Sequence, residues 1–170
     1  ALQDGRTARF VVGDGSPLVD LLAWGEADFY SGSFDEKGLQ QLLLYVSGQR
    51  RIPLRQWARF IRKAPEVWLL NVFDLAQPPV PDVLVLTTRD AGSAMERIRS
   101  RGRVRESWEN EAFLARLQEG YRQVASVLRK RRIEVVELDA LDLDVDRAAE
   151  EIEAACRRLV LKGAEAVLGG

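Results

Sequence analysis

Five arginines stand at every second position between residues 97 and 105, which concentrates positive charge in one short stretch. Arginines near the carboxyl end of a helix stabilise the negative pole of the helix dipole, which accounts for one or two of the five. The chain as a whole is almost neutral, with 25 basic and 26 acidic side chains. The charge of this arginine stretch, residues 97–105, is therefore local, and the stretch is a candidate for binding or catalysis.

A second candidate is Asp14, in the sequence VVGDGSP. It directly follows an apolar run, and the neighbouring Gly13 and Gly15 allow the backbone to come close to a ligand. Open α/β sheets place their chemistry at the carboxyl ends of strands, which is where Asp14 is expected. An aspartate before a turn can also be a plain turn residue, and both interpretations stay open.

Composition excludes several classes of function. With no histidine and one cysteine, Cys156, the chain has neither a zinc site nor a histidine-based triad, and we assign no metal ligands. Balanced charge argues against binding to DNA, RNA or a membrane surface. A single cysteine forms no internal disulfide, no apolar run approaches the roughly 20 residues of a membrane span, and the first residues lack the shape of a signal peptide. We therefore expect a cytoplasmic protein.

Three short apolar runs, at 9–12, 83–86 and 133–138, predict strands. Their apolar character is continuous, which is typical of strands covered on both faces in a parallel sheet. Helical patterns follow the second and third runs, and this order indicates an α/β fold with helices on both faces of the sheet. We expect the three strands to be parallel, with Asp14 and the loop 139–141 at the carboxyl edge.

The helices that position these strands have recognisable ends. Asp90 is expected to cap a helix that stops at Gly102, and apolar residues at helical spacing from 113 to 128 predict the next helix. Asp144 is expected to cap a final helix. The predicted apolar face of that helix consists of Val145, Ala149, Ile152, Cys156 and Leu159.

Residues 31–76 differ in character and are interpreted as a helical insertion. Three helical patterns follow one another there, and Pro53 and Pro65 stand near the starts of the second and third. These helices are candidates for the surface of a homodimer. The tryptophans at 24, 57 and 68 are candidates for contact with a nucleotide or a protein partner.

Four stretches resemble the later part of the thymidylate kinases and the related deoxynucleoside kinases. The resemblance covers most of the chain except residues 31–80, and its most specific part is ERIRSRGRVRE followed by the FLARLQEGY helix. It implies a P-loop nucleoside or nucleotide kinase-like domain over residues 1–170, with a lid at 97–111 and with ATP and Mg²⁺ as cofactors. The four stretches are ALQDGRTARFVVGDGSP, PDVLVLTTRDAGSAMERIRSRGRVRE, ENEAFLARLQEGYRQVA and IEVVELDALD with AAEEIEAAC.

The resemblance also assigns roles to individual residues. In the implied catalytic set, an acid lies beside the phosphoryl acceptor and the magnesium while two arginines face the phosphates; these are Asp14, Arg101 and Arg103. The residues implied to bind ATP, around its adenine, are Arg97, Asp139, Ala140 and Leu141. Those implied to contact the acceptor are Ser16, Arg105 and Glu106.

Two features depart from the family pattern. Gly15 stands where the family has an arginine, which removes an expected bidentate contact with the acceptor. The phosphate loop, Gly-x-x-x-x-Gly-Lys followed by Ser or Thr, does not occur in these residues. We therefore expect the loop upstream of residue 1 in a parent kinase, with these 170 residues inactive alone. The alternative is a non-catalytic relative that binds a nucleotide or a protein partner.

Overall fold

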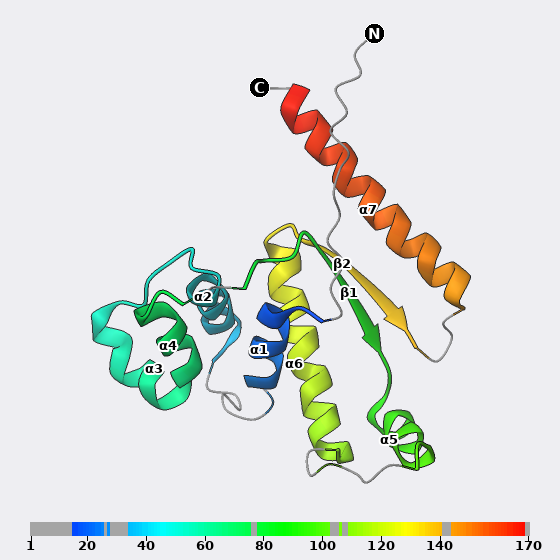
Figure 1. The fold of residues 1–170 in the computed structure, drawn as a ribbon, viewed down its shortest axis with the longest axis horizontal. Helices are drawn as coiled ribbons and strands as arrows, with labels where there is room; N and C mark the ends of the chain where they lie inside the picture. The colour runs from blue at the N-terminus through cyan, green and yellow to red at the C-terminus, as the bar shows by residue number, and fades with distance from the viewer. Residues whose placement is uncertain are drawn as a thin grey trace.

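Two parallel strands form the sheet of the computed structural model, with helices on either side (Figure 1). β1 (Val83–Thr88) pairs with β2 (Glu134–Asp139) in one continuous register. The structure describes residues 15–25, 27, 34–75, 78–102, 106, 109–140 and 144–168. Within them the fold is mixed α/β and mostly helical, and the predicted parallel pairing of the second and third runs is confirmed. The strand predicted at 9–12 lies outside the described residues.

The two strands are not covered equally on both faces. Leu84 and Leu86 are buried, whereas Val85 between them keeps 36% of its surface exposed. Side chains alternate between the faces of a strand, so the two leucines share one face and the valine lies on the other. The expectation that the continuous apolar run is buried on both sides is therefore wrong for β1, because the cover on the second face is incomplete.

Two ion pairs show which helix covers which face. Arg129, at the end of α6 (Glu111–Lys130), binds Glu137 at 2.7 Å, and Arg158 of α7 (Val145–Leu168) binds Glu134 at 2.8 Å. Glu137 is in register with Leu86 and therefore lies on the leucine face. Glu134 precedes Glu137 by three positions in the same strand, and since side chains alternate along a strand, it lies on the opposite face. Helix α6 therefore packs on the leucine face and α7 on the other.

Helix α6 is the central element of the fold, as Figure 1 shows. The predicted helix is confirmed, and the Asn110 side chain caps it by accepting a hydrogen bond from the Phe113 N–H at 2.9 Å. Besides the sheet, α6 contacts α1 (Pro17–Trp24), α2 (Glu36–Val46) and α5 (Ala91–Ser100). Its buried residues are Phe113, Leu117, Gly120, Val124, Ala125, Val127 and Leu128.

Helix α1 approaches α6 so closely that no side chain fits between them at one point. A Cβ placed on Gly120 would lie 2.6 Å from the carbonyl oxygen of Ala23. Helix α1 was not predicted, because Gly15, Ser16 and Pro17 are residue types that are typical of a turn. The same residues start a helix, since the Ser16 hydroxyl accepts a hydrogen bond from the Val19 N–H at 3.5 Å.

The helices predicted between residues 31 and 76 are confirmed in the described part of that segment. They are α2, the short 3₁₀ turn η2 (Leu54–Gln56), α3 (Trp57–Lys63) and α4 (Pro65–Val72). Pro65 occupies the first turn of α4, as expected. Their apolar side chains join the same core as α1, α6 and β1. The largest fully buried ones are Leu42, Leu43, Tyr45, Val46, Phe60 and Val67.

One buried amide holds the loop between α2 and α3 in place. Among the described residues, Asn71 is the single buried polar side chain, with 3% of its surface exposed. Its Oδ1 accepts from the Ile52 N–H at 2.7 Å, while its Nδ2 donates to the carbonyl oxygens of Tyr45 and Arg50 at 3.2 and 3.0 Å. Both polar groups of this buried side chain therefore have partners, and they join the segment after α2 to α4.

The ends of α5 follow the sequence prediction. The Asp90 side chain caps the helix by accepting from the Ser93 N–H at 2.9 Å, and hydrogen bonds from the side chain and the backbone of Ser93 lower the pKa of the Asp90 carboxyl. Gly102 has a φ of 65°, a left-handed conformation that a glycine adopts without strain. The helix therefore ends where the sequence indicates.

The predicted apolar face of α7 is wrong in part. Val145 is 77% exposed and Ala149 is also exposed, whereas Ala148 and Ala155 are buried. The start is as expected, because Asp144 Oδ1 accepts from the Asp146 N–H at 3.3 Å. Helix α7 meets the sheet through its small residues, which lets the helix lie close to β2 and turns Val145 to solvent.

We expect Gly120→Ala to destabilise the protein by about 2 kcal/mol or more, because the added methyl group meets a backbone carbonyl that cannot move independently. Gly92→Ala in α5 is the matched control. Its new Cβ would approach the ends of two side chains, Asp90 Oδ1 at 3.2 Å and Glu111 Oε1 at 3.9 Å, so the change should be neutral or stabilise by up to about 1 kcal/mol. Chemical denaturation of both variants measures the difference. Equal effects would show that the close approach of α1 to α6 is not a constraint.

Candidate functional site

At the carboxyl edge of the sheet, hydrogen bonds link the ends of the two strands and the residues that follow them. The Ala140 N–H donates to the carbonyl oxygen of Thr88 at 2.8 Å, and Arg89 Nη2 donates to the carbonyl oxygen of Ala140 at 3.3 Å. Asp139 and Ala140, implied to lie near adenine, are therefore at the expected edge. Leu141 and Asp14 lie outside the described residues. Arg89 is a member of this edge that the sequence analysis missed.

A cavity of about 200 Å³ opens at this edge, between β1, α5 and α6. We call it the Arg89 cavity, because Arg89 is the one charged residue in its lining. Most of its wall is apolar, with a few polar groups that converge from separate elements, as in many ligand sites. Its lining residues are Leu86, Thr87, Thr88, Arg89, Ala91, Ala94, Leu114, Leu117, Gln118 and Tyr121.

Tyr121 is fixed in this wall by a residue far away in the sequence. Its hydroxyl donates to Asp20 Oδ1 at 2.7 Å, which links α6 to α1. Burial, together with the hydrogen bond to Asp20 and the negative charge of that carboxylate, raises the pKa of Tyr121 above its ordinary value. Neither residue was identified from the sequence, because the contact spans 101 positions and follows no local pattern.

The described part of the arginine stretch is exposed. Arg97, Arg99 and Arg101 occupy the last turn of α5 and its carboxyl cap, and among the described residues no ion pair joins any of them to a carboxylate. Arg97 and Arg101 lie one turn apart on the same side of the helix. Arg103 and Arg105 lie outside the described residues. This end of α5 therefore carries several guanidinium groups available to an anion.

Two further predicted residues have local structural roles. Ser16 caps α1, as described above. The Glu106 N–H donates to Glu109 Oε2 at 2.9 Å, and the Glu109 N–H donates to the Glu106 carbonyl oxygen at 3.0 Å. These bonds form a tight turn before α6. The structure does not bring Ser16 and Glu106 into contact with each other, and their predicted roles toward an acceptor stay predictions.

The tryptophans named as candidate contacts are packed in two separate places. Trp24 lies against Phe113, with ring centroids 5.5 Å apart, where α1 meets α6. Trp57 and Trp68 lie edge to face at 6.0 Å between α3 and α4. All three are partly buried against the core. They do not form one aromatic surface for a ligand.

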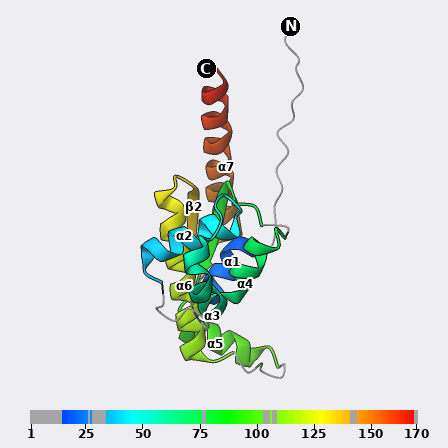
Figure 2. The same cartoon turned by 90° about the vertical axis from the view of Figure 1, so that its left-hand side faces the viewer.

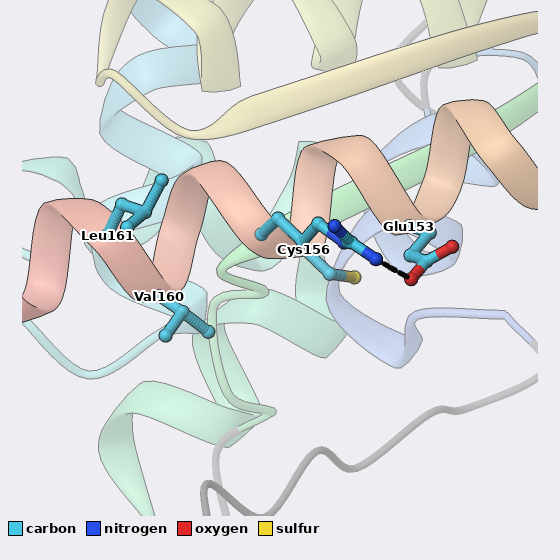
Figure 3. Close-up of a pocket in the computed structure, with 5 residues that line it drawn as sticks. Glu153, Cys156, Val160 and Leu161 are labelled. Atoms are coloured by element: carbon cyan, nitrogen blue, oxygen red, sulfur yellow. Dashed lines mark hydrogen bonds and ion pairs between the residues drawn. The ribbon is translucent and has the colours of Figure 1, made fainter.

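A second hollow, of about 470 Å³, lies along α7 (Figure 3). Every lining residue comes from that one helix, at positions spaced by one turn: Glu153, Cys156, Arg157, Val160 and Leu161. Arg157 is paired with Glu153 at 2.7 Å. Since no other element of the described residues closes the hollow, no set of described groups converges there, and we regard it as the open side of a helix.

The described residues suit the phosphates of ATP better than its metal. Exposed arginines on α5 and Arg89 at the sheet edge are the side chains that bind phosphate oxygens in proteins. In the described part of the chain, no group of three or more histidine, cysteine, aspartate or glutamate side chains is placed to hold a metal ion. Among the described residues, therefore, only the anionic part of the implied cofactor finds groups that fit it.

Comparison of the chain with protein-family models, with curated proteins and with solved structures found no match. Of the helices in the described residues, none combines the length and the apolar character that crossing a bilayer requires.

Tyr121→Phe should cost about 1 kcal/mol near neutral pH, because Asp20 loses its hydrogen-bond donor. The folded protein raises the tyrosine pKa above the unfolded value of about 10, so the wild type keeps its full stability below pH 10 and loses stability as pH rises further. The phenylalanine variant has no hydroxyl at this position to ionise, so its stability does not fall for this reason above pH 10. Thermal unfolding from pH 8 to 11 should show the two proteins converging above pH 10. A constant difference would contradict the role assigned to the hydroxyl.

Proposed function

We propose that the parent protein of these residues transfers a phosphoryl group from ATP to a nucleoside or a nucleoside monophosphate. The observation that carries this proposal is the exposed arginine cluster at the end of α5, which has no carboxylate partner among the described residues. A helix dipole explains one or two such arginines, and a solvated face would be expected to pair some of them. The resemblance to thymidylate and deoxynucleoside kinases gives the cluster a role.

The proposed residues have different roles, according to their charge and their position. Arg101 and Arg103 would stabilise the negative charge that spreads over the transferred group, and Arg97 with residues 139–141 would line the adenine. Asp14 would lie beside the acceptor, with Ser16, Arg105 and Glu106 around it. ATP would supply the phosphoryl group, and Mg²⁺ would neutralise charge on its phosphates. The phosphate loop would come from sequence outside these residues.

Arg101→Ala in the full-length protein should lower kcat by at least about 10²-fold and leave the fold intact, because Arg101 is exposed and packs against no core residue. The matched control is Arg122→Ala on α6. Arg122 is also exposed, and its nearest carboxylate, Glu119, is 4.0 Å away. The assay measures ATP-dependent phosphorylation of a panel of nucleosides and nucleoside monophosphates. Absence of transfer to every acceptor, or equal small effects of both substitutions, would refute the kinase proposal.

A second candidate function, protein interaction, is favoured by an exposed apolar surface on the opposite side of the molecule. Large apolar side chains between residues 54 and 75, from η2 to just after α4, are 42 to 74% exposed. Such a density is typical of interaction surfaces. We propose that this segment joins two copies of the chain, which is compatible with either a catalytic or a non-catalytic protein. The exposed residues are Leu54, Ile61, Leu69, Phe73 and Leu75.

Leu54→Glu should shift the chain from dimer to monomer in sedimentation equilibrium at micromolar concentration, because Leu54 is 74% exposed and a carboxylate there would be buried without a partner in a dimer. Leu161→Glu on α7, where the leucine is 64% exposed, is the control and should leave the mass unchanged. A wild-type chain that sediments as a monomer at all concentrations would rule out the dimer.

A further inference from the structure

The guanidinium of Arg89 is held in a fixed position with one donor unused. Its Nη2 donates to the carbonyl oxygen of Ala140 at 3.3 Å. Its Nε–H is buried and has no hydrogen-bond partner among the residues that the structure describes. Buried donors in folded proteins are almost always paired, since leaving one unpaired costs the desolvation of that group. Arg89 also lines the cavity at the sheet edge, so a guanidinium anchored by the Ala140 carbonyl borders a space that an acceptor can enter.

The charge around this donor favours an anion. Within the lining of the Arg89 cavity, Arg89 carries the one formal charge, and the other polar residues are Thr87, Thr88, Gln118 and Tyr121. The Asp20 carboxylate lies behind Tyr121 and the Asp90 carboxylate caps α5, and neither residue belongs to the lining. Among the lining residues, the charge that an anion would meet is that of the Arg89 guanidinium.

We propose that the Arg89 cavity binds the phosphate group of a small molecule, with Arg89 as its principal contact. A volume of about 200 Å³ is sufficient for a phosphate or pyrophosphate group. Arginine presents several donors in one plane, which matches the oxygens of a phosphate, and the Gln118 amide adds a neutral donor. The proposal does not depend on phosphoryl transfer, because Arg89 belongs to the end of β1 and not to the arginine stretch on α5.

Isothermal titration of the 170-residue chain with inorganic phosphate and with pyrophosphate tests this site. Arg89→Lys keeps the positive charge but removes the Nε–H and the planar donor set, so the affinity should fall at least about tenfold. Ala94→Leu fills the cavity while leaving Arg89 intact, and should weaken binding as much. Arg122→Ala removes an exposed arginine of α6 and should stay within about twofold of the wild type.

Thermal unfolding first establishes that the variants fold, so that a change in phosphate affinity reports on the site itself. Loss of phosphate affinity in both Arg89→Lys and Ala94→Leu, with Arg122→Ala unaffected, supports the site. No binding up to about 10 mM, or wild-type affinity in Arg89→Lys, overturns it. A parallel titration with malonate distinguishes phosphate from a general oxyanion, because malonate binding equal to or tighter than that of pyrophosphate would contradict the assignment to phosphate.

Discussion

The fold depends on the packing of α6 on two sides at once. One side of this helix covers the leucine face of the two-stranded sheet, and another meets α1 at a distance that only a glycine at 120 allows. Helices α2 and α5 then contact the same helix. Since a sheet of two strands buries little surface by itself, the apolar area along α6 supplies much of the driving force that holds the sheet, α1 and the helices of residues 34–75 in one core.

That core leaves the charged groups in two different situations. Along α6 and α7, arginines are paired with carboxylates of the sheet or of their own helix, as with Arg129, Arg157 and Arg158. At the end of α5, the described arginines have no such partner. A nearly neutral chain therefore keeps a local excess of positive charge, close in sequence to the edge where Arg89 joins β1 to the exit of β2.

The two surfaces discussed above lie at different ends of the molecule. In Figure 1, α3 and α4 are on the left and α5 is at the lower right, and Figure 2 shows α7 and α5 at opposite ends of the perpendicular view. A partner on the apolar surface of α3 and α4 would therefore leave the carboxyl edge of the sheet accessible. Association through that surface and binding at the sheet edge would then involve different parts of the molecule.

Local patterns in the sequence determined the two described strands, the helices after them and the caps at Asp90 and Asp144, because these depend on neighbours within a few residues. The exposed arginines were likewise visible as a run. Tertiary structure alone decided which residues of α7 face the sheet, since small side chains at 148 and 155 give a closer fit than the larger ones predicted. It also decided the pairing of Tyr121 with Asp20 and of Arg89 with Ala140. These contacts join positions 101 and 51 residues apart, and no periodicity along the chain encodes them.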